Sequence, residues 1–285
     1  MKIIDPHIHL WDLSTGLYPQ FETPTDSFIG NNKAIARSYL LDEFLDEAGS
    51  ELKIAGAVHV EAFPTDPVAE TKMIQAVNTT SPVPLAVVGA ASLQDPALPM
   101  LLDRHCEVRE FRGVRQVVNL HADPFYTYAN TDFMADPAWR DGFAMLAGRD
   151  LSFDLQLYPH QIGLACEVLE HSAETRVAVN HAAMWMDRTP EGWRSWRDGL
   201  RRLAEWPNVS MKISGLGMFD HKWTTESIRP LIYEVLEAFG TNRSMFASNF
   251  PVDKLFSSYR TIWAAFQTCT DSLSGSEQQD LCFET

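Results

Sequence analysis

Short apolar runs alternate with amphipathic helical patterns along this chain of 285 residues, and this alternation restricts the fold more than any other feature. Eight runs are rich in Val, Ile, Leu, Ala and Phe, as is typical of parallel strands that helices cover. The runs span residues 2–10, 53–61, 84–92, 111–119, 152–158, 176–183, 208–215 and 243–249. The helical patterns span residues 66–78, 96–106, 137–148, 161–171, 192–206, 226–239 and 258–268.

The order of these elements predicts the fold class. In the clearest helical pattern, 226–239, apolar side chains recur along one face, and Gly240 follows as an end signal. Eight successive strand–helix units predict an α/β fold, a (β/α)8 TIM barrel that occupies residues 1–285 as a single domain. A doubly wound open sheet is the alternative, but it would place a Gly-rich phosphate turn after its first strand, where this chain has His-x-His.

Charge and composition narrow the classes of partner. The net charge of −15 and the lack of a basic stripe argue against nucleic acid and against an anionic membrane surface. No apolar run reaches the roughly 18 residues of a membrane span, and the N-terminus lacks a signal-peptide pattern. The four cysteines lie far apart in the sequence, as in proteins of the reducing cytoplasm. We expect a cytoplasmic protein with a small-molecule substrate, and a homo-oligomer is compatible with these features.

The first predicted strand carries an unusual pattern, KIIDPHIHLWD, at residues 2–12. Residues two apart on a strand point to the same face, so Asp5, His7 and His9 should lie in one row. Two imidazoles in this arrangement suit a shared metal ion or a polarised carbonyl oxygen. The alternative for Asp5 is a structural role, in which it holds a histidine tautomer or caps the loop.

Polar side chains recur near the C-terminal ends of the other predicted strands, where barrel enzymes carry their active sites. Alternation along each strand predicts that the following residues face the barrel mouth: His59, Glu61, Ser92, Arg115, Asp154, Gln156, Tyr158, His181, Lys212, Ser214 and Asn249. His160 lies just beyond the fifth run, and Asp253 lies shortly after the eighth. Two insertions, 13–35 and 120–136, follow strand ends and are predicted to form lids or pocket walls. The histidines in or beside helices, His105, His171 and His221, are expected at the surface.

Three of these inward-facing residues also have a structural interpretation. His59 would then bond a neighbouring carbonyl group, and Lys212 would pair with an acid inside the barrel. For Arg115 the structural interpretation is an ion pair with Glu61 or Asp154.

Four stretches together resemble the amidohydrolase superfamily, in the branch called amidohydrolase-2. They are DPHIHLWD, GVRQ around Arg115, VNHAA around His181 and MFASNFPVDKL around Asn249, and they cover nearly the whole chain in order. The GVR, PHQ and SNFPVD segments are most similar to the sugar lactonases and the pyrone-dicarboxylate lactonase of that branch. The branch also contains aminocarboxymuconate-type decarboxylases.

The resemblance implies roles for several residues. His7, His9 and His181 would bind a divalent metal ion, zinc first among the candidates, or would polarise the substrate carbonyl directly. Arg115 would bind a substrate carboxylate or hydroxyl group through its planar fork. The further predicted substrate contacts are His59, Tyr158, His160 and Lys212.

The chain departs from the family pattern in two ways. The strand-four lysine or strand-five histidine of binuclear relatives is not evident, so we expect one metal ion at most. The family's strand-eight aspartate, a general base and metal ligand, aligns with Asn249, whose amide cannot accept a proton from water. Metal binding is therefore expected to be weak or absent, and Asp253 or a histidine becomes the candidate base. Related chains run on past the final FET, which leaves a trimmed C-terminus open.

These features together predict a hydrolase that opens a small lactone or a related cyclic ester. The predicted catalytic residues are His7, His9, His181, Asn249 and Asp253. Three alternatives stay open: a non-oxidative decarboxylase of a small aromatic or muconate-type acid, a lactone isomerase, and a non-catalytic ligand-binding barrel.

Overall fold

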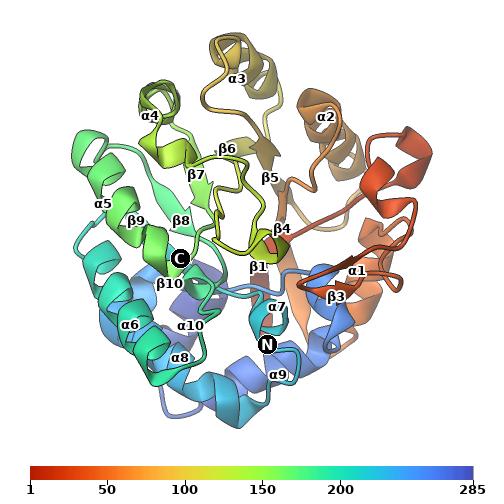
Figure 1. Cartoon of the computed structure of the whole chain (residues 1–285). Coiled ribbons are helices and arrows are strands. Elements are labelled where there is room, and N and C mark those ends of the chain that lie inside the picture. Colours follow the sequence, from red (N-terminus) through yellow and green to blue (C-terminus); the bar gives the residue numbers. More distant parts are fainter. Residues whose placement is uncertain (285) are drawn as a thin grey trace.

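The computed structural model describes residues 1–284 and confirms the predicted single-domain barrel. Eight parallel strands form one sheet in which spatial order follows chain order, and the helices surround it (Figure 1). The strands are β1 (Lys2–Ile8), β4 (Lys53–Val60), β5 (Leu85–Ala90), β6 (Phe111–Arg115), β7 (Ser152–Leu155), β8 (Val177–Val179), β9 (Val209–Ile213) and β10 (Ser244–Phe246).

All seven predicted helices are present, and three further short ones had not been predicted. The predicted ones are α2 (Pro67–Asn78), α3 (Leu98–Cys106), α4 (Pro137–Ala144), α5 (Ile162–His171), α6 (Pro190–Ala204), α8 (Thr225–Phe239) and α9 (Tyr259–Cys269). The additional ones are α1 (Leu41–Ala48), α7 (Leu216–Phe219) and α10 (Gly275–Gln279). In α1, Leu41, Phe44 and Ala48 are buried at helical spacing, but the pattern covers only 8 residues.

The barrel closes where β1 meets the segment after β10. The backbone N–H of Asn249 donates to the His7 carbonyl group at 2.9 Å, and that of His9 donates to the Phe250 carbonyl group at 2.7 Å. Asp5 lies at the same seam, where its carboxylate accepts from the Ser248 N–H at 3.0 Å and from the Tyr259 hydroxyl at 3.0 Å. The Asp5 carboxylate therefore accepts hydrogen bonds from the backbone and from a tyrosine, and it does not fix the tautomer of a histidine.

Two predicted strands end earlier than expected because the backbone turns left-handed. The run 176–183 forms a strand only over Val177–Val179, and residues 181–184 all have positive φ angles, between 44° and 55°. The run 243–249 ends at Phe246, and Asn249 has φ of 57°. Left-handed backbone breaks the side-to-side alternation of a strand, so it re-aims His181 and Asn249 at the barrel mouth.

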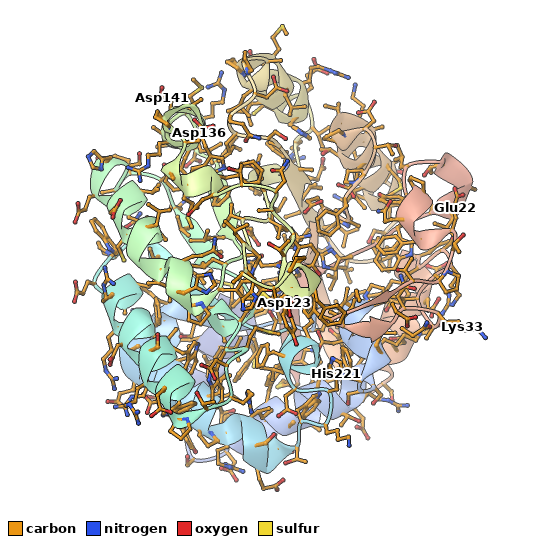
Figure 2. The ribbon with its side chains drawn as sticks, viewed as in Figure 1. Glu22, Lys33, Asp123, Asp136, Asp141 and His221 are labelled. Carbon is orange, nitrogen blue, oxygen red and sulfur yellow. The ribbon has the colours of Figure 1, made fainter. Side chains whose placement is uncertain are left out.

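The two insertions lie at the C-terminal end of the barrel. The first contains a small hairpin of β2 (Asp26–Ser27) and β3 (Gly30–Asn31), and the second contains two 3-10 turns. Asp123 of the second insertion lies over the middle of the barrel, whereas Glu22 and Lys33 of the first lie at its edge (Figure 2).

The remaining features concern histidines, cysteines and membrane spans. His171 and His221 are exposed as predicted, but His105 is fully buried, so its predicted surface position was wrong. The reason is local: Nδ1 of His105 lies 2.9 Å from the Thr71 hydroxyl, and its ring stacks on Phe111. All four cysteines are free. Among the residues that the structure describes, no helix has the length and apolar content to cross a membrane.

Candidate active site

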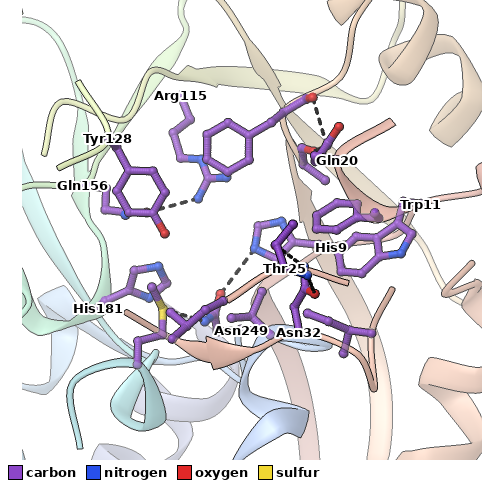
Figure 3. Close-up of a pocket in the computed structure, with 17 residues that line it drawn as sticks. His9, Trp11, Gln20, Thr25, Asn32, Arg115, Tyr128, Gln156, His181 and Asn249 are labelled. Atoms are coloured by element: carbon purple, nitrogen blue, oxygen red, sulfur yellow. Dashed lines mark hydrogen bonds between the residues drawn. The ribbon is translucent and has the colours of Figure 1, made fainter. Parts of the chain in front are cut away.

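A cavity of about 200 Å³ opens at the C-terminal mouth of the barrel (Figure 3). Strand ends supply its polar wall: His9, Arg115, Gln156, His181 and Asn249. The first insertion supplies Gln20, Phe21, Thr25, Ile29, Asn32 and Ile35, and the second supplies Tyr128. Both insertions therefore form pocket walls, as the sequence predicted.

Three histidines converge beside this cavity. The ring centroid of His7 lies 5.0 Å from that of His9 and 4.7 Å from that of His181. Burial lowers the pKa of His9 to about 3 and lowers the pKa values of His7 and His181 well below 6.5. All three imidazoles are therefore neutral at pH 7 and offer nitrogen lone pairs rather than charge.

Hydrogen bonds set the orientation of two of these rings. Nδ1 of His9 lies 2.7 Å from the Val60 carbonyl oxygen, so Nδ1 carries the hydrogen and Nε2 carries the lone pair. Nδ1 of His181 lies 2.9 Å from the Ser214 hydroxyl, which leaves Nε2 for the cavity. His7 differs from both, because neither of its buried ring nitrogens has a hydrogen-bond partner in the described chain.

A glycine makes room for His181. Gly215 has φ of 62°, and a Cβ atom there would lie 2.5 Å from Nδ1 of the His181 ring. A contact that short is not tolerated, and the left-handed conformation is itself unfavourable for other residues. A larger residue at position 215 is therefore disfavoured for two reasons: the left-handed backbone and the clash with the His181 ring.

Asn249 lies between His9 and the predicted base Asp253. Its Oδ1 is 3.3 Å from Nε2 of His9, and its Nδ2 is 2.7 Å from Oδ2 of Asp253. The other carboxylate oxygen of Asp253 accepts from the Gly217 N–H at 2.8 Å, and burial raises the pKa of Asp253 to about 7. Asp253 does not line the cavity. Its carboxylate therefore contacts Asn249 and the Gly217 backbone rather than the cavity.

Arg115 forms the ion pair that the sequence offered as its structural alternative. Its Nε donates to Oε1 of Glu61 at 2.6 Å, and one Nη donates to the Glu61 backbone carbonyl at 2.6 Å. Its other Nη lies 3.4 Å from the Gln156 side-chain oxygen. Both charged side chains are buried, yet Arg115 also lines the cavity. A guanidinium has five N–H groups, so two remain to bind a ligand.

The other predicted substrate contacts do not line this cavity. Lys212 pairs with Asp154 at 2.5 Å, as its structural alternative proposed. His59 accepts from the Leu10 backbone N–H at 3.1 Å instead of bonding a carbonyl group, and its Nε2 faces Glu70 at 3.4 Å. The Tyr158 hydroxyl donates to the Tyr126 carbonyl group, and His160 is exposed and donates to the Leu120 carbonyl group.

Several cavity residues were not predicted. Trp11 and Phe21 stack with ring centroids 4.1 Å apart on one side of the pocket, and Phe63 lies beside Arg115. The aromatic content of the insertions was the available signal for Phe21 and Tyr128. Phe63 gave no signal, because its position depends on a backbone turn with a positive φ angle.

The donor set can be tested against the metal ion that the resemblance implies. Three neutral imidazoles and one amide oxygen suit zinc, and the unpartnered nitrogens of His7 are otherwise costly to bury. Within residues 1–284, however, no three His, Cys, Asp or Glu side chains already form a ligand set. The chemistry of the donors fits a divalent ion.

The fold and this site define a class: a barrel enzyme with a neutral histidine cluster at the C-terminal mouth of its strands. The sequence profile of the family described as amidohydrolase matches residues 4–285. The chain therefore belongs to the amidohydrolase family.

Three relatives are informative. The uncharacterized protein y4mH of Sinorhizobium fredii is 44% identical over 285 residues, covering 99% of this chain and 95% of that protein. An L-fucono-1,5-lactonase of Burkholderia multivorans is 28% identical, covering 98% of this chain and 92% of that enzyme. A crystal structure of a Burkholderia multivorans amidohydrolase with bound zinc is 26% identical, with a TM-score of 0.83 over 100% of this chain and 97% of that one.

Proposed function

We propose that this protein hydrolyses a small uncharged lactone at the histidine cluster. The observation that carries the proposal is the charge state of the cavity: its imidazoles are neutral, and its cation, Arg115, is already paired with Glu61. An uncharged cyclic ester needs no unpaired cation, whereas an aromatic or muconate-type acid does. The similarity to L-fucono-1,5-lactonase supports the same class of substrate.

The residues that line the cavity have different roles in this proposal. Arg115 and Gln156 would bind substrate hydroxyl groups, and Trp11 with Phe21 would exclude water from the opposite side. No carboxylate of the described residues lines the cavity, so the chain's proton acceptors there are the imidazoles of His9 and His181.

The proposal includes one divalent metal ion, zinc first among the candidates, held by His7, His9 and His181. The zinc in the similar Burkholderia multivorans structure supports this part. Such an ion would supply Lewis-acid chemistry, which polarises a lactone carbonyl and makes water easier to ionise. The four free cysteines agree with a cytoplasmic location, which is also part of the proposal.

The test is a titrimetric assay of the full chain against sugar 1,5-lactones, with a parallel assay for CO₂ release from aromatic acids. We expect acid release from lactones, and a fall in kcat/KM of about 100-fold or more in His181→Asn. CO₂ release would instead indicate a decarboxylase, and a rearranged lactone without acid release an isomerase. Binding without turnover of any compound would indicate a non-catalytic barrel.

A further inference from the structure

A second cavity of about 340 Å³ adjoins the first at the C-terminal ends of β4, β5 and β6. Glu61, Ser92 and Gln116 contribute its polar lining. Three residues line both cavities, namely Phe63, Arg115 and Tyr128. These three side chains therefore form the wall between the two spaces.

Phe63 is held in this wall by an unfavourable backbone conformation. Its φ angle is 56°, which is unfavourable for a bulky residue that carries a Cβ atom. Its N–H donates to Oε2 of Glu61 at 2.6 Å, and its carbonyl accepts from the Gln20 side chain at 3.1 Å. Strain of this kind persists where the surroundings enforce it, and functional sites are where it concentrates.

Aromatic and cationic groups complete the wall. The rings of Phe63 and Tyr128 are nearly parallel, at 8°, with centroids 6.1 Å apart. The Arg115 guanidinium lies 5.6 Å from the centre of the Phe63 ring. Figure 3 shows Arg115 and Tyr128 together on the side of the pocket that faces away from Asn32. Phe63 is 49% exposed, so removal of its side chain would open a passage rather than a sealed void.

The second cavity suits an uncharged, hydroxylated chain. Its carboxylate, Glu61, is neutralised by Arg115, so an anion placed there would meet Glu61 without gaining an unpaired cation. The side chain of Gln116 already bonds Leu93, Gln94 and Trp139. The hydroxyl of Ser92 makes no hydrogen bond within residues 1–284 and is free to bond a ligand.

We propose that Phe63 determines which lactones this enzyme accepts. Its ring confines the substrate to the first cavity and excludes lactones with a long exocyclic chain, which the second cavity would otherwise hold through Ser92 and Arg115. The inference rests on the proposed lactone hydrolysis and adds the size limit of the substrate and the residue that sets it.

The test compares two compounds that differ in the exocyclic chain alone. D-xylono-1,5-lactone has no exocyclic carbon, and a heptono-1,5-lactone with the same arrangement of ring hydroxyl groups carries a hydroxylated chain of two carbons. Phe63→Ala should raise the kcat/KM ratio of the heptonolactone to the xylonolactone by about tenfold or more, as expected when a steric block is removed. The double variant Phe63→Ala/Ser92→Phe, which refills the second cavity, should lose that gain. Phe125→Ala is the matched control, because Phe125 is an exposed aromatic of the same face that lines neither cavity.

An unchanged ratio in Phe63→Ala, or a gain that survives in the double variant, would overturn the proposal. If Phe63→Ala fails to fold, Phe63→Gly replaces it, because glycine adopts positive φ without strain. If the wild-type enzyme opens neither lactone, the proposed function fails, and calorimetry with the two corresponding lactams decides the size limit separately. Equal affinities of the wild type and Phe63→Ala for the heptonolactam would then reject the role of Phe63.

Discussion

The side-chain oxygen of Asn249 lies 3.3 Å from Nε2 of His9, and neither atom carries a hydrogen for the other. The His9 ring is neutral and places its hydrogen on Nδ1, toward the Val60 carbonyl group. The amide group of Asn249 donates to Oδ2 of Asp253 at 2.7 Å and to the sulfur of Met218 at 3.1 Å. Two lone pairs therefore face each other, an arrangement that a cation between them would stabilise.

This relationship leads to the first prediction, which uses a swap variant. Asn249→Asp/Asp253→Asn keeps the net charge and the hydrogen bond between the two side chains but moves the carboxylate to the cavity. We expect zinc to bind the swap variant at least about tenfold more tightly than the wild type, a difference of about 1.4 kcal/mol, because an anionic ligand replaces a neutral one. Calorimetric titration of chelator-treated proteins measures this directly.

The control for the swap is Asn242→Asp, which adds a charge beside the opposite end of β10. It should leave zinc affinity unchanged. A wild-type protein that keeps a full equivalent of zinc after chelator dialysis would contradict the prediction, as would equal affinities of wild type and swap variant.

The second prediction concerns the buried pair of Arg115 and Glu61. Arg115→Met should destabilise the fold by about 3–5 kcal/mol, because it leaves a buried carboxylate unpaired. Arg115→Met/Glu61→Leu should recover most of that loss, since both charges are then removed. The measurement is the free energy of unfolding in urea. Arg176→Met is the control: its pair with Asp150 is exposed, and its loss should change stability by about 1 kcal/mol or less. Wild-type stability in Arg115→Met would show that the pair is not structural.

The third prediction separates the two demands on Gly215. Gly215→Ala forces a Cβ atom against the His181 ring and should lower kcat/KM by about 10- to 100-fold, because a displacement of about 1 Å suffices for such losses. Gly16→Ala shares the positive φ, at 72°, but its Cβ would meet no atom within 4 Å. It should reduce stability by about 1 kcal/mol and leave kinetics unchanged. Equal kinetic effects of both changes would mean that the contact with His181 is unimportant.

The fold could be predicted from the sequence because each strand and most helices carry their own apolar pattern. The unpredicted helix α1 shows the limit, since 8 residues are too few for a clear period. His9 and Arg115 line the cavity as alternation predicted, although β1 ends at Ile8 and the ladders of both β1 and β6 contain register shifts.

The candidate site was harder to predict where the backbone leaves the strand. Asp253 was expected near the cavity, but the left-handed turn at Asn249 puts the amide in front of the carboxylate. Phe63 was not predicted, because its position between the two cavities depends on a positive φ angle that cannot be read from the residue type. Tyr158 and Lys212 were predicted to face inward and contact substrate. In the structure the Tyr158 hydroxyl donates to the Tyr126 carbonyl group, and Lys212 forms an ion pair with Asp154. Alternation along a strand predicts the direction of a side chain, whereas its hydrogen-bond and ion-pair partners depend on the tertiary structure.

The last prediction concerns Glu43 of α1, which anchors the segment after β10. Its carboxylate bonds Arg37 at 2.5 and 2.7 Å and Lys254 at 2.7 Å. The hydrogen bond with Arg37, followed by Lys254, lowers the pKa of Glu43 from 4.5 to about 2. Because the folded-state pKa is depressed, the ionised group stabilises the fold above about pH 4.5, and this contribution is lost as the pH falls toward 2.

Glu43→Gln should therefore be less stable than the wild type at pH 7 and should approach it as the pH falls from about 4.5 toward 2. The difference at pH 7 should be about 0.5–1 kcal/mol, because the side chain is 30% exposed and the interaction is screened. Urea unfolding at pH 7, 4 and 3 measures the convergence, and 1 M NaCl should shrink the difference at pH 7. Glu22→Gln is the control, since Glu22 is exposed at the edge of the barrel and makes no ion pair in the described chain (Figure 2). A stability difference that stays constant from pH 7 to 3 would show that the charge of Glu43 does not anchor this segment.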